Sequence, residues 1–325
     1  MEKSVVLVTG GAGYIGSHTV RLLKDKYDVI IFDSLFRGNI ESVPQDVKFV
    51  KGDLLDKEAL NRVFTENKID SVIHFAGLAY VGESSQKSEL YYNVNVNGSF
   101  NLFAAMSENG VKEIVFSSTC SIYGNSAQNP IDESQPPVPS NRYGQTKRMV
   151  ELLLKDFELS YNFRYVSLRY FNAAGCSPTG EIGEKHTPEP HLIPVVVLAA
   201  LTGATVSVFG NDYNTPDGTC IRDFIHVCDL ATAHISALDY LKETKKSEIF
   251  NLGSGTGYSV LEIIKKVEEL TGLKVKYNIL GRREGDPAVL IASSEKAANV
   301  LNWKPEYNLD DMILTAFNWF KNPKF

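Results

Sequence analysis

The sequence predicts an α/β protein with a Rossmann-type, doubly wound parallel sheet and a smaller α/β substrate-binding domain. Three observations support this fold class. Short apolar runs alternate with helix-period segments through residues 1–174, as in a parallel sheet covered by helices. The first apolar run, residues 5–8, ends in a cluster of glycines. After Ala173 the composition changes, and Gly, Pro and charged residues gather over 175–191.

The first domain is expected to cover residues 1–174. Its strands are short runs of mainly Val, Ile and Phe, which suit strands buried on both faces. Its helices carry apolar residues three and four positions apart, as in Leu60, Val63 and Phe64. Right-handed crossovers place the carboxyl ends of such strands along one edge, where a ligand binds. The expected strands are 5–8, 28–32, 47–50, 71–75, 113–117 and 165–168, and the expected helices begin near Tyr14 and cover 57–67, 89–108 and 143–159.

The second domain, residues 175–325, is expected to bind mainly the substrate. An alternative in which segments near 220–255 return to the main sheet stays open. The elements expected in this domain are a loop over 175–191, a strand within 205–229 that precedes a turn-prone segment at 211–218, a strand at 225–227, a helix at 258–270, a strand at 275–279 and two further helices.

Bulk properties exclude several classes of protein. The chain of 325 residues can bury a sizeable core without disulfides. Its net charge of −6 gives no electrostatic case for binding nucleic acid or an anionic membrane. The longest apolar stretch, residues 192–201, is too short to span a bilayer. The four cysteines have no metal-type spacing, which fits a reducing compartment, and we expect a cytoplasmic protein. No metal is expected, because ligand-like spacing is also missing from His186, His191, His226 and His234.

The glycines after the first strand form a dinucleotide-binding fingerprint. Gly11, Gly13 and Gly16 have the Gly-x-Gly-x-x-Gly spacing, and Gly10 begins an overlapping pattern. Glycine lets the backbone approach a ligand closely, and the following helix N-terminus favours an anion. Asp33 ends the second strand about 20 residues further on, where a carboxylate binds the adenosine ribose. That carboxylate would repel a 2′-phosphate, so the sequence predicts NAD rather than NADP.

A second group of residues indicates proton transfer. Tyr143 and Lys147 lie four residues apart, on one face of an expected helix. A free Tyr has a pKa of about 10 and is a poor base at neutral pH. A nearby ammonium and a positive nicotinamide both favour the phenolate, so we expect them to lower that pKa. The hydroxyls of Ser117, Ser118 and Thr119 follow the fifth strand and can hold the reacting oxygen.

With these residues in view, the sequence resembles the extended short-chain dehydrogenases/reductases, and within them the UDP-glucose 4-epimerase family. The matching segments run nearly end to end. Those typical of the superfamily are 9–18, 74–77 and 143–147, and those more specific to nucleotide-sugar 4-epimerases are 169–175, 218–219 with 222–227, and 282–286.

The resemblance implies a role for particular residues, with Tyr143, Lys147 and Thr119 catalytic. The residues implied to bind NAD are Gly10, Gly13, Tyr14, Ile15 and Gly16 at the pyrophosphate, Asp33 and Ser34 at the adenosine ribose, Asp53 and Leu54 at the adenine, Phe75, Ala76 and Gly77 along the middle of the cofactor, Tyr143, Lys147 and Phe171 at the nicotinamide end, and Asn95. The residues implied to bind the UDP-sugar are Thr119, Asn172, Leu192, Phe209, Arg222, Arg283, Asp286 and Val289. Two departures from many relatives are Ala79 in place of Lys, and Val94 in place of a cofactor-binding Asn, with Asn95 adjacent.

The implied reaction is epimerisation at C4 of UDP-glucose and UDP-galactose with recycled NAD. Tyr143 would take the 4-hydroxyl proton while hydride leaves C4 for the nicotinamide. The 4-keto sugar would turn over while tethered by its UDP, and hydride would return to the opposite face. Val289 stands where some relatives carry a larger residue, which leads to the hypothesis that UDP-GlcNAc and UDP-GalNAc are also substrates. The resemblance also implies a homodimer.

Three alternative functions compete with this one. A nucleotide-sugar 4,6-dehydratase usually has Asp-Glu after the Thr, whereas Cys120 and Ser121 follow Thr119 here. A UDP-glucuronate or other UDP-sugar 4-epimerase on the same scaffold stays open. A non-catalytic NAD-binding regulator would have no need of Tyr143, Lys147 and a placed hydroxyl together.

Overall fold

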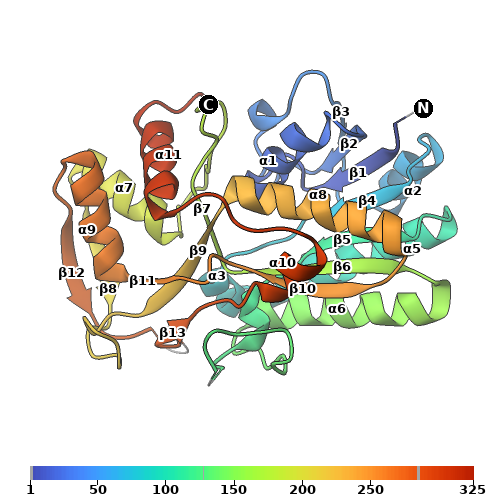
Figure 1. Ribbon diagram of the computed structural model, residues 1–325. Helices are drawn as coiled ribbons and strands as arrows, with labels where there is room; N and C mark the ends of the chain where they lie inside the picture. The colour runs from blue at the N-terminus through green and yellow to red at the C-terminus, as the bar shows by residue number, and fades with distance from the viewer. Residues whose placement is uncertain (1–2, 127, 284–285) are drawn as a thin grey trace.

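The computed structural model describes residues 3–126, 128–283 and 286–325, and within these ranges its largest element is a seven-stranded parallel sheet (Figure 1). The strand order is β10-β6-β5-β4-β1-β2-β3, so the chain winds outwards from β1 in both directions, as in a doubly wound sheet. The predicted fold class is therefore confirmed. The chain crosses from β3 over to β4, on the other side of β1. The strands are β1 (Val5–Thr9), β2 (Asp28–Asp33), β3 (Lys48–Lys51), β4 (Ser71–His74), β5 (Glu113–Ser117), β6 (Arg164–Tyr170) and β10 (Glu248–Leu252).

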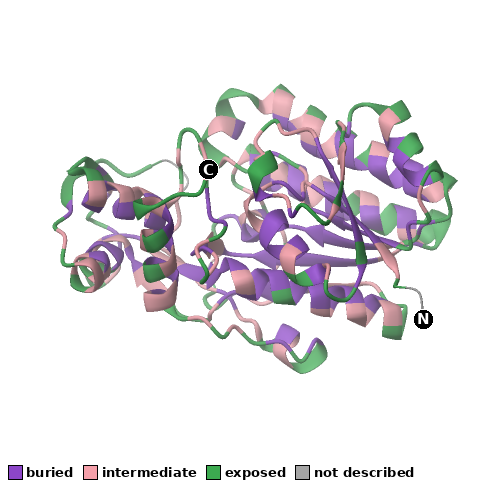
Figure 2. Cartoon of the chain, turned by 90° about the horizontal axis from the view of Figure 1, so that it is seen from above, coloured by how far each residue is buried: buried purple, intermediate pink, exposed green. Residues whose placement is uncertain are grey.

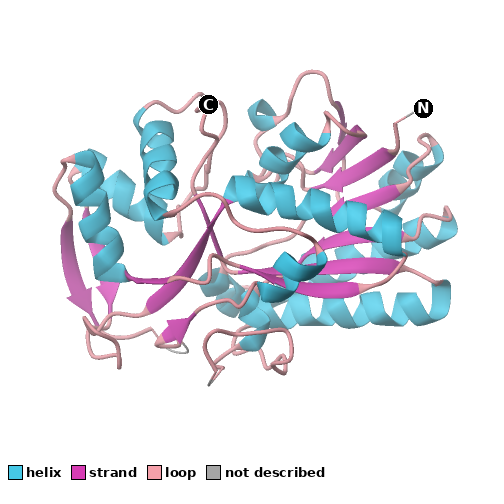
Figure 3. Cartoon of the chain, viewed as in Figure 1, coloured by secondary structure: helices cyan, strands magenta, loops and turns pink. Residues whose placement is uncertain are grey.

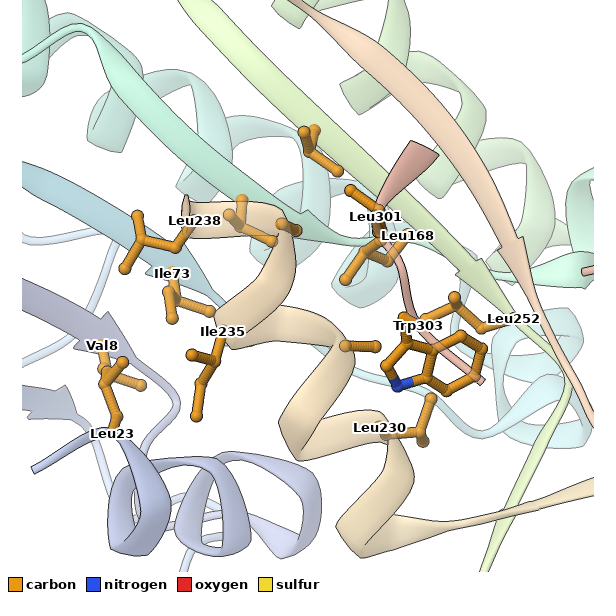
Figure 4. Close-up of a cluster of buried hydrophobic side chains, with 14 of the residues drawn as sticks. Val8, Leu23, Ile73, Leu168, Leu230, Ile235, Leu238, Leu252, Leu301 and Trp303 are labelled. Atoms are coloured by element: carbon orange, nitrogen blue, oxygen red, sulfur yellow. The ribbon is translucent and has the colours of Figure 1, made fainter. Parts of the chain in front are cut away.

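Helices cover both faces of this sheet because its strands carry apolar side chains on both sides. Val6 and Val8 of β1 belong to one core, together with Leu23 of helix α1 (Tyr14–Leu23) and Leu238 of helix α8 (Val227–Thr244); Figure 4 labels Val8, Leu23 and Leu238 in this core. Leu7 of the same strand points into the opposite core. The helices on the first face are α1 (Tyr14–Leu23) and α8 (Val227–Thr244), and those on the second are α2 (Lys57–Thr65), α5 (Gly98–Glu108) and α6 (Arg142–Tyr161). The central strands are consequently buried, whereas the edge strand β3 is intermediate to exposed (Figure 2).

The segment expected as one helix over 89–108 has three parts. Helix α4 (Ser88–Tyr91) leads into a π-helical segment, η2 (Tyr92–Asn97), and then into α5. Each π turn contains more residues than an α turn, so it shifts which side chains face inward. The apolar pattern did not reveal this change. Two short 3₁₀ segments, η1 (Ile40–Ser42) and η3 (Cys120–Tyr123), and a short helix, α3 (Val81–Gln86), lie in loops that follow strands.

Two long helices were not anticipated from the sequence. Helix α7 (Leu192–Thr202) is apolar nearly all round, so it shows no helical period. Helix α8 leads directly into β10, which pairs with β6 in parallel. Residues 227–252 therefore lie in the layers of the main sheet and not with the smaller unit.

The smaller unit is built on β7 (Asn172–Ala174) and β9 (Ile221–His226), which pair in parallel. It lies beside one end of the main sheet (Figure 3). Its helices and strands pack around an apolar core of their own, separate from the two cores of the main sheet. Its other elements are β8 (Thr205–Phe209), β11 (Gly257–Ser259), β12 (Lys276–Leu280), β13 (Val289–Leu290), α7, α9 (Val260–Thr271) and α11 (Leu309–Lys321), whereas α10 (Glu295–Val300) lies against β10. No helix in the described ranges is long and apolar enough to cross a bilayer.

Candidate active site

A cavity of about 490 Å³ runs along the carboxyl edge of the main sheet. Residues that end or follow β1 to β6 line it, including Gly10, Asp33, Ala76, Ser117 and Phe171. This edge is where a doubly wound sheet binds its ligand. Nearly all of the residues implied for NAD line the cavity, namely Gly10, Gly13, Tyr14, Ile15, Gly16, Asp33, Ser34, Asp53, Leu54, Phe75, Ala76, Gly77, Tyr143, Lys147 and Phe171.

The glycine loop forms a tight cradle between β1 and α1. Gly10 has a φ of +74°, and a Cβ there would lie 2.5 Å from the amide nitrogen of Ala76. A Cβ on Gly16 would lie 2.2 Å from the carbonyl oxygen of Gly10, so only glycine fits. Gly13 precedes the first turn of α1 and has no side chain that could cap it. The N–H groups of that turn are therefore available to an anion, which fits a diphosphate.

Asp33 is held in place at the next strand end. Its side chain is buried and accepts hydrogen bonds from the backbone N–H of Ala12 (3.0 Å) and of Leu35 (2.8 Å). Burial raises the pKa of Asp33, and these two hydrogen bonds oppose the rise. Arg37 lies nearby, stacked 3.9 Å from the ring centroid of Tyr80 and paired with Glu83.

Tyr143 and Lys147 both lie at the cavity, on one face of α6 as expected. The Nζ of Lys147 donates to the carbonyl oxygen of Ser117 at 2.8 Å and lies 6.0 Å from the Tyr143 ring centroid. Burial lowers the pKa of Lys147 to about 8, against the opposing charge of Glu151. Burial also raises the pKa of the Tyr143 phenol, with Tyr170 adding to the rise.

The ammonium of Lys147 and the nicotinamide were expected to lower the pKa of Tyr143 together, and without the nicotinamide the effect of Lys147 does not outweigh burial. Desolvation of the phenolate is the largest effect, and a hydrogen bond from Thr119 acts against it. The ammonium of Lys147 is directed at a backbone carbonyl instead of the phenol. The other expected source of positive charge is the nicotinamide ring of the cofactor.

The start of α6 is fixed by contacts that the sequence did not reveal. Asn141 caps the helix by accepting from the N–H of Gly144 at 2.8 Å. The N–H of Tyr143 donates to Ser84 Oγ at 3.1 Å. A Cβ on Gly144 would lie 2.4 Å from the carbonyl oxygen of Ser121, so the helix packs directly on the backbone after β5.

A buried ion pair anchors the next turn of α6. Arg169 of β6 donates through Nε (3.0 Å) and NH2 (2.6 Å) to the two carboxylate oxygens of Glu151. Ser118 donates to the same carboxylate at 2.6 Å, and Arg169 also donates to the Tyr123 hydroxyl at 2.9 Å. This network connects the strand end that carries Thr119 to the helix that carries Tyr143 and Lys147.

Asn95 does not line the cavity, unlike its neighbour Val94. Its Nδ2 donates to the carbonyl of Leu78 and to Thr146 Oγ1, both at 3.0 Å, and its Oδ1 accepts from the N–H of Leu78 at 2.7 Å. The side chain is 2% exposed and is occupied by these contacts. In the structure Asn95 holds the segment after β4 through these contacts.

The residues implied for the substrate fall into two places. Thr119 and Asn172 line the cavity. The others lie in the smaller unit and outside the cavity lining: Leu192, Phe209, Arg222, Arg283, Asp286 and Val289. The neighbouring Glu284 and Gly285 of the 282–286 segment lie outside the described residues.

Contacts join four of these six residues in two pairs. The Arg283 guanidinium lies 3.8 Å from the Phe209 ring centroid, and Arg222 lies 3.6 Å from a carboxylate oxygen of Asp286. Val289 pairs with Ile221 in β13 and β9. Because β9 also pairs with β7, which begins at Asn172, this group continues from the end of the cavity.

Comparisons with known proteins agree with this geometry. The model of the NAD dependent epimerase/dehydratase family matches residues 6–253. The chain is 50% identical over 319 residues to a UDP-glucose 4-epimerase of Halalkalibacterium halodurans, covering 97% of this chain and 95% of that protein. It is similar to the crystal structure of UDP-glucose 4-epimerase from Brucella ovis in complex with NAD, with a TM-score of 0.95 and 44% identity over 98% of each chain. The Bifidobacterium longum UDP-glucose 4-epimerase in complex with NAD⁺ and UDP has a TM-score of 0.93 and 41% identity, over 98% of this chain and 99% of that one.

Proposed function

The chain belongs to the NAD-dependent epimerase/dehydratase family, and from this premise we infer that it epimerises UDP-glucose and UDP-galactose at C4. The observation that carries the inference is the single cavity that joins the glycine cradle, Asp33 and the Tyr143–Lys147 pair. A regulator that only binds NAD would have no use for a tyrosine and a lysine at the hydroxyl-bearing end of that cavity.

The cavity fits NAD. The cradle at Gly10, Gly13 and Gly16 suits the pyrophosphate, and the oriented carboxylate of Asp33 suits the adenosine ribose. Tyr143 and Lys147 lie at the other end, where they suit the nicotinamide ribose. When bound, NAD supplies an acceptor and then a donor for the hydride at C4 of the sugar.

The residues of the chain supply proton transfer and positioning. Tyr143 takes the proton from the 4-hydroxyl and later returns it, so the sugar passes through a 4-keto form. Thr119 holds the reacting oxygen beside it. The ammonium of Lys147 donates a hydrogen bond to the carbonyl of Ser117, which holds it within the site. Through this contact it does not occupy the phenol of Tyr143. Burial raises the pKa of the phenol, which favours its protonated form.

The UDP-sugar is assigned mainly to residues 175–325, and NAD mainly to residues 1–174. Asn172, Arg222 and Arg283 are proposed to hold the diphosphate, since guanidinium groups bind phosphate oxygens through charge-assisted hydrogen bonds. Phe209, Asp286 and Leu192 are proposed to seat the uridine. Firm contacts to UDP and few to the hexose allow the 4-keto sugar to turn over without leaving.

Identification of products by NMR tests this function and its range of substrates. UDP-galactose, UDP-N-acetylgalactosamine and UDP-glucuronate are incubated separately with the purified protein. Conversion of UDP-galactose to UDP-glucose supports the proposal. Conversion of the N-acetyl sugar as well would support a wide pocket at Val289, whose exposure is intermediate. Conversion of UDP-glucuronate alone, or of no sugar, would overturn the assignment.

We also propose that the protein is a homodimer in the cytoplasm. Helices α5 and α6 lie together on one face of the main sheet. Their outer surfaces expose Phe100 (45%), Leu152 (51%), Leu159 (76%) and Tyr161 (50%). A surface of this kind is typical of a contact between subunits. Light scattering after size exclusion at micromolar concentration tests the dimer, and a mass of one chain would contradict it.

A further inference from the structure

Four potential metal ligands meet on the loop between β7 and α7. Glu184, His186, Glu189 and His191 each offer one ligand atom, and these atoms all lie within 4.8 Å of one another. The expectation of no metal rested on the spacing of the histidines, which matches no helix or strand pattern. The loop brings the four side chains together through its own path, which spacing alone does not show.

Imidazole nitrogens and carboxylate oxygens alternate around this group, hereafter the Glu/His cluster. The Nδ1 of His191 lies 2.5 Å from Glu184 Oε1 and 3.1 Å from Glu189 Oε1. The Nδ1 of His186 lies 3.1 Å from Glu184 Oε1 and 3.5 Å from Glu189 Oε2. Zinc bonds of roughly 2.0–2.1 Å in a tetrahedron separate neighbouring ligand atoms by about 3.3 Å. The four imidazole–carboxylate separations, 2.5–3.5 Å, lie around that spacing, and all pairs of ligand atoms lie within 4.8 Å, so side-chain movements could bring the four atoms around one ion.

Hydrogen bonding supplies an independent observation. Glu184 is 1% exposed, and neither of its carboxylate oxygens makes a well-aligned hydrogen bond among the residues that the structure describes; Oε1 has only the close charge contacts with His186 and His191 given above. Within the same ranges, His186 Nδ1 and Glu189 Oε2 also lack a well-aligned hydrogen bond and contact each other only at 3.5 Å. A buried carboxylate of this kind is costly unless its charge is compensated, which protonated histidines or a bound cation would do.

We propose that Glu184, His186, Glu189 and His191 form a binding site for Zn²⁺ or a chemically similar divalent transition metal. Two imidazole nitrogens and two carboxylate oxygens suit zinc, whereas Mg²⁺ and Ca²⁺ prefer oxygen ligands. The four side chains fill a tetrahedral shell and leave no position open for a substrate, which is the pattern of a structural site. The ion enters from the cavity side, since His186 and His191 both line the cavity.

The Glu/His cluster lies at the wall of the cofactor cavity, close to the glycine cradle. The His186 ring meets the edges of Tyr14, at 6.3 Å between centroids, and of Tyr80, at 5.5 Å. Tyr14 begins α1 beside the glycine cradle, and its hydroxyl donates to the carbonyl of Gly175. An ion bound to all four side chains would hold the loop between β7 and α7 in one conformation at this wall of the cavity. On the proposed function, it would slow the release of NAD.

Zinc titration tests the site without any measurement of turnover. Protein stripped with EDTA and dialysed is titrated with ZnCl₂ by calorimetry, with MgCl₂ in a parallel run. The expected result is one zinc per chain, with binding at least tenfold weaker in His186→Ala/His191→Ala. Glu181→Gln is the matched control, because Glu181 lies on the same loop with its side chain 59% exposed, and it should bind as the unchanged protein does.

The outcomes distinguish the Glu/His cluster from zinc bound elsewhere on the chain. The double variant keeps all four cysteines, so equal zinc binding in both proteins would place the zinc outside the cluster and overturn the proposal. The absence of zinc binding to the unchanged protein would overturn it equally. If the double variant fails to fold, His191→Asn replaces it, because the His191 side chain is 39% exposed. X-ray absorption of the zinc complex should then show nitrogen and oxygen neighbours at roughly 2.0–2.1 Å.

Discussion

Replacing Glu151 by Gln should destabilise the protein strongly, because it leaves the charge of Arg169 buried without its counter-ion. The two side chains are 8% and 5% exposed and form the paired hydrogen bonds at 3.0 and 2.6 Å. Removal of one partner from a buried ion pair costs about 3–5 kcal/mol. Gln still offers one acceptor oxygen to Arg169, so we expect a loss at the lower end, about 3 kcal/mol.

Urea unfolding followed by fluorescence and circular dichroism measures this loss as a change in the free energy of unfolding. The control is Glu269→Gln, since the Lys265–Glu269 pair is exposed (78% and 52%) and should change stability by less than about 1 kcal/mol. The double variant Glu151→Leu/Arg169→Met should recover most of the loss, because well-packed apolar residues often replace a buried pair without cost. A Glu151→Gln protein as stable as the control would refute the reasoning.

Three further predictions concern the cavity. Gly16→Ala should weaken NAD binding at least tenfold by calorimetry, because its Cβ would lie 2.2 Å from a carbonyl oxygen, while Gly82→Ala, with no described heavy atom within 4 Å, should not. Asp33→Asn should narrow the preference for NAD over NADP at least tenfold in the same assay, and an unchanged preference would remove Asp33 from the ribose. Lys147→Met should be more stable than the unchanged protein at about pH 7, by an amount that shrinks towards about pH 10. Burial lowers the folded pKa of Lys147 to about 8 from 10.5, so the folded protein releases this proton first and its stability rises with pH between these two values. A difference in stability that stays constant with pH would contradict this assignment.

Local sequence predicted the cofactor half of the cavity well. The cradle at residues 10–16 and Asp33 lie at the ends of neighbouring strands, so their positions follow from the alternation of strands and helices. The spacing of Tyr143 and Lys147 likewise places them on one helix face. In each case, a short segment with a regular period fixes the direction of the side chain.

The sequence failed where tertiary contacts decide the outcome. Asn95 is buried within a π-helical segment and Val94 lines the cavity, so adjacency to Val94 did not make Asn95 a cavity residue. The helix α7 shows no period because its residues are apolar nearly all round. The Glu/His cluster depends on the path of an irregular loop, and the pKa of Tyr143 depends on burial that only the packed structure reveals.

The measurement that tests the central claim most directly is the turnover number of Tyr143→Phe with UDP-galactose. The matched control is Tyr277→Phe, since Tyr277 lies in β12, is 43% exposed and lies outside the cavity lining. If Tyr143 transfers the proton, kcat should fall by about 10²–10⁴-fold in Tyr143→Phe, with NAD content unchanged, and stay unchanged in the control. Turnover by Tyr143→Phe within a few-fold of the control would contradict the account.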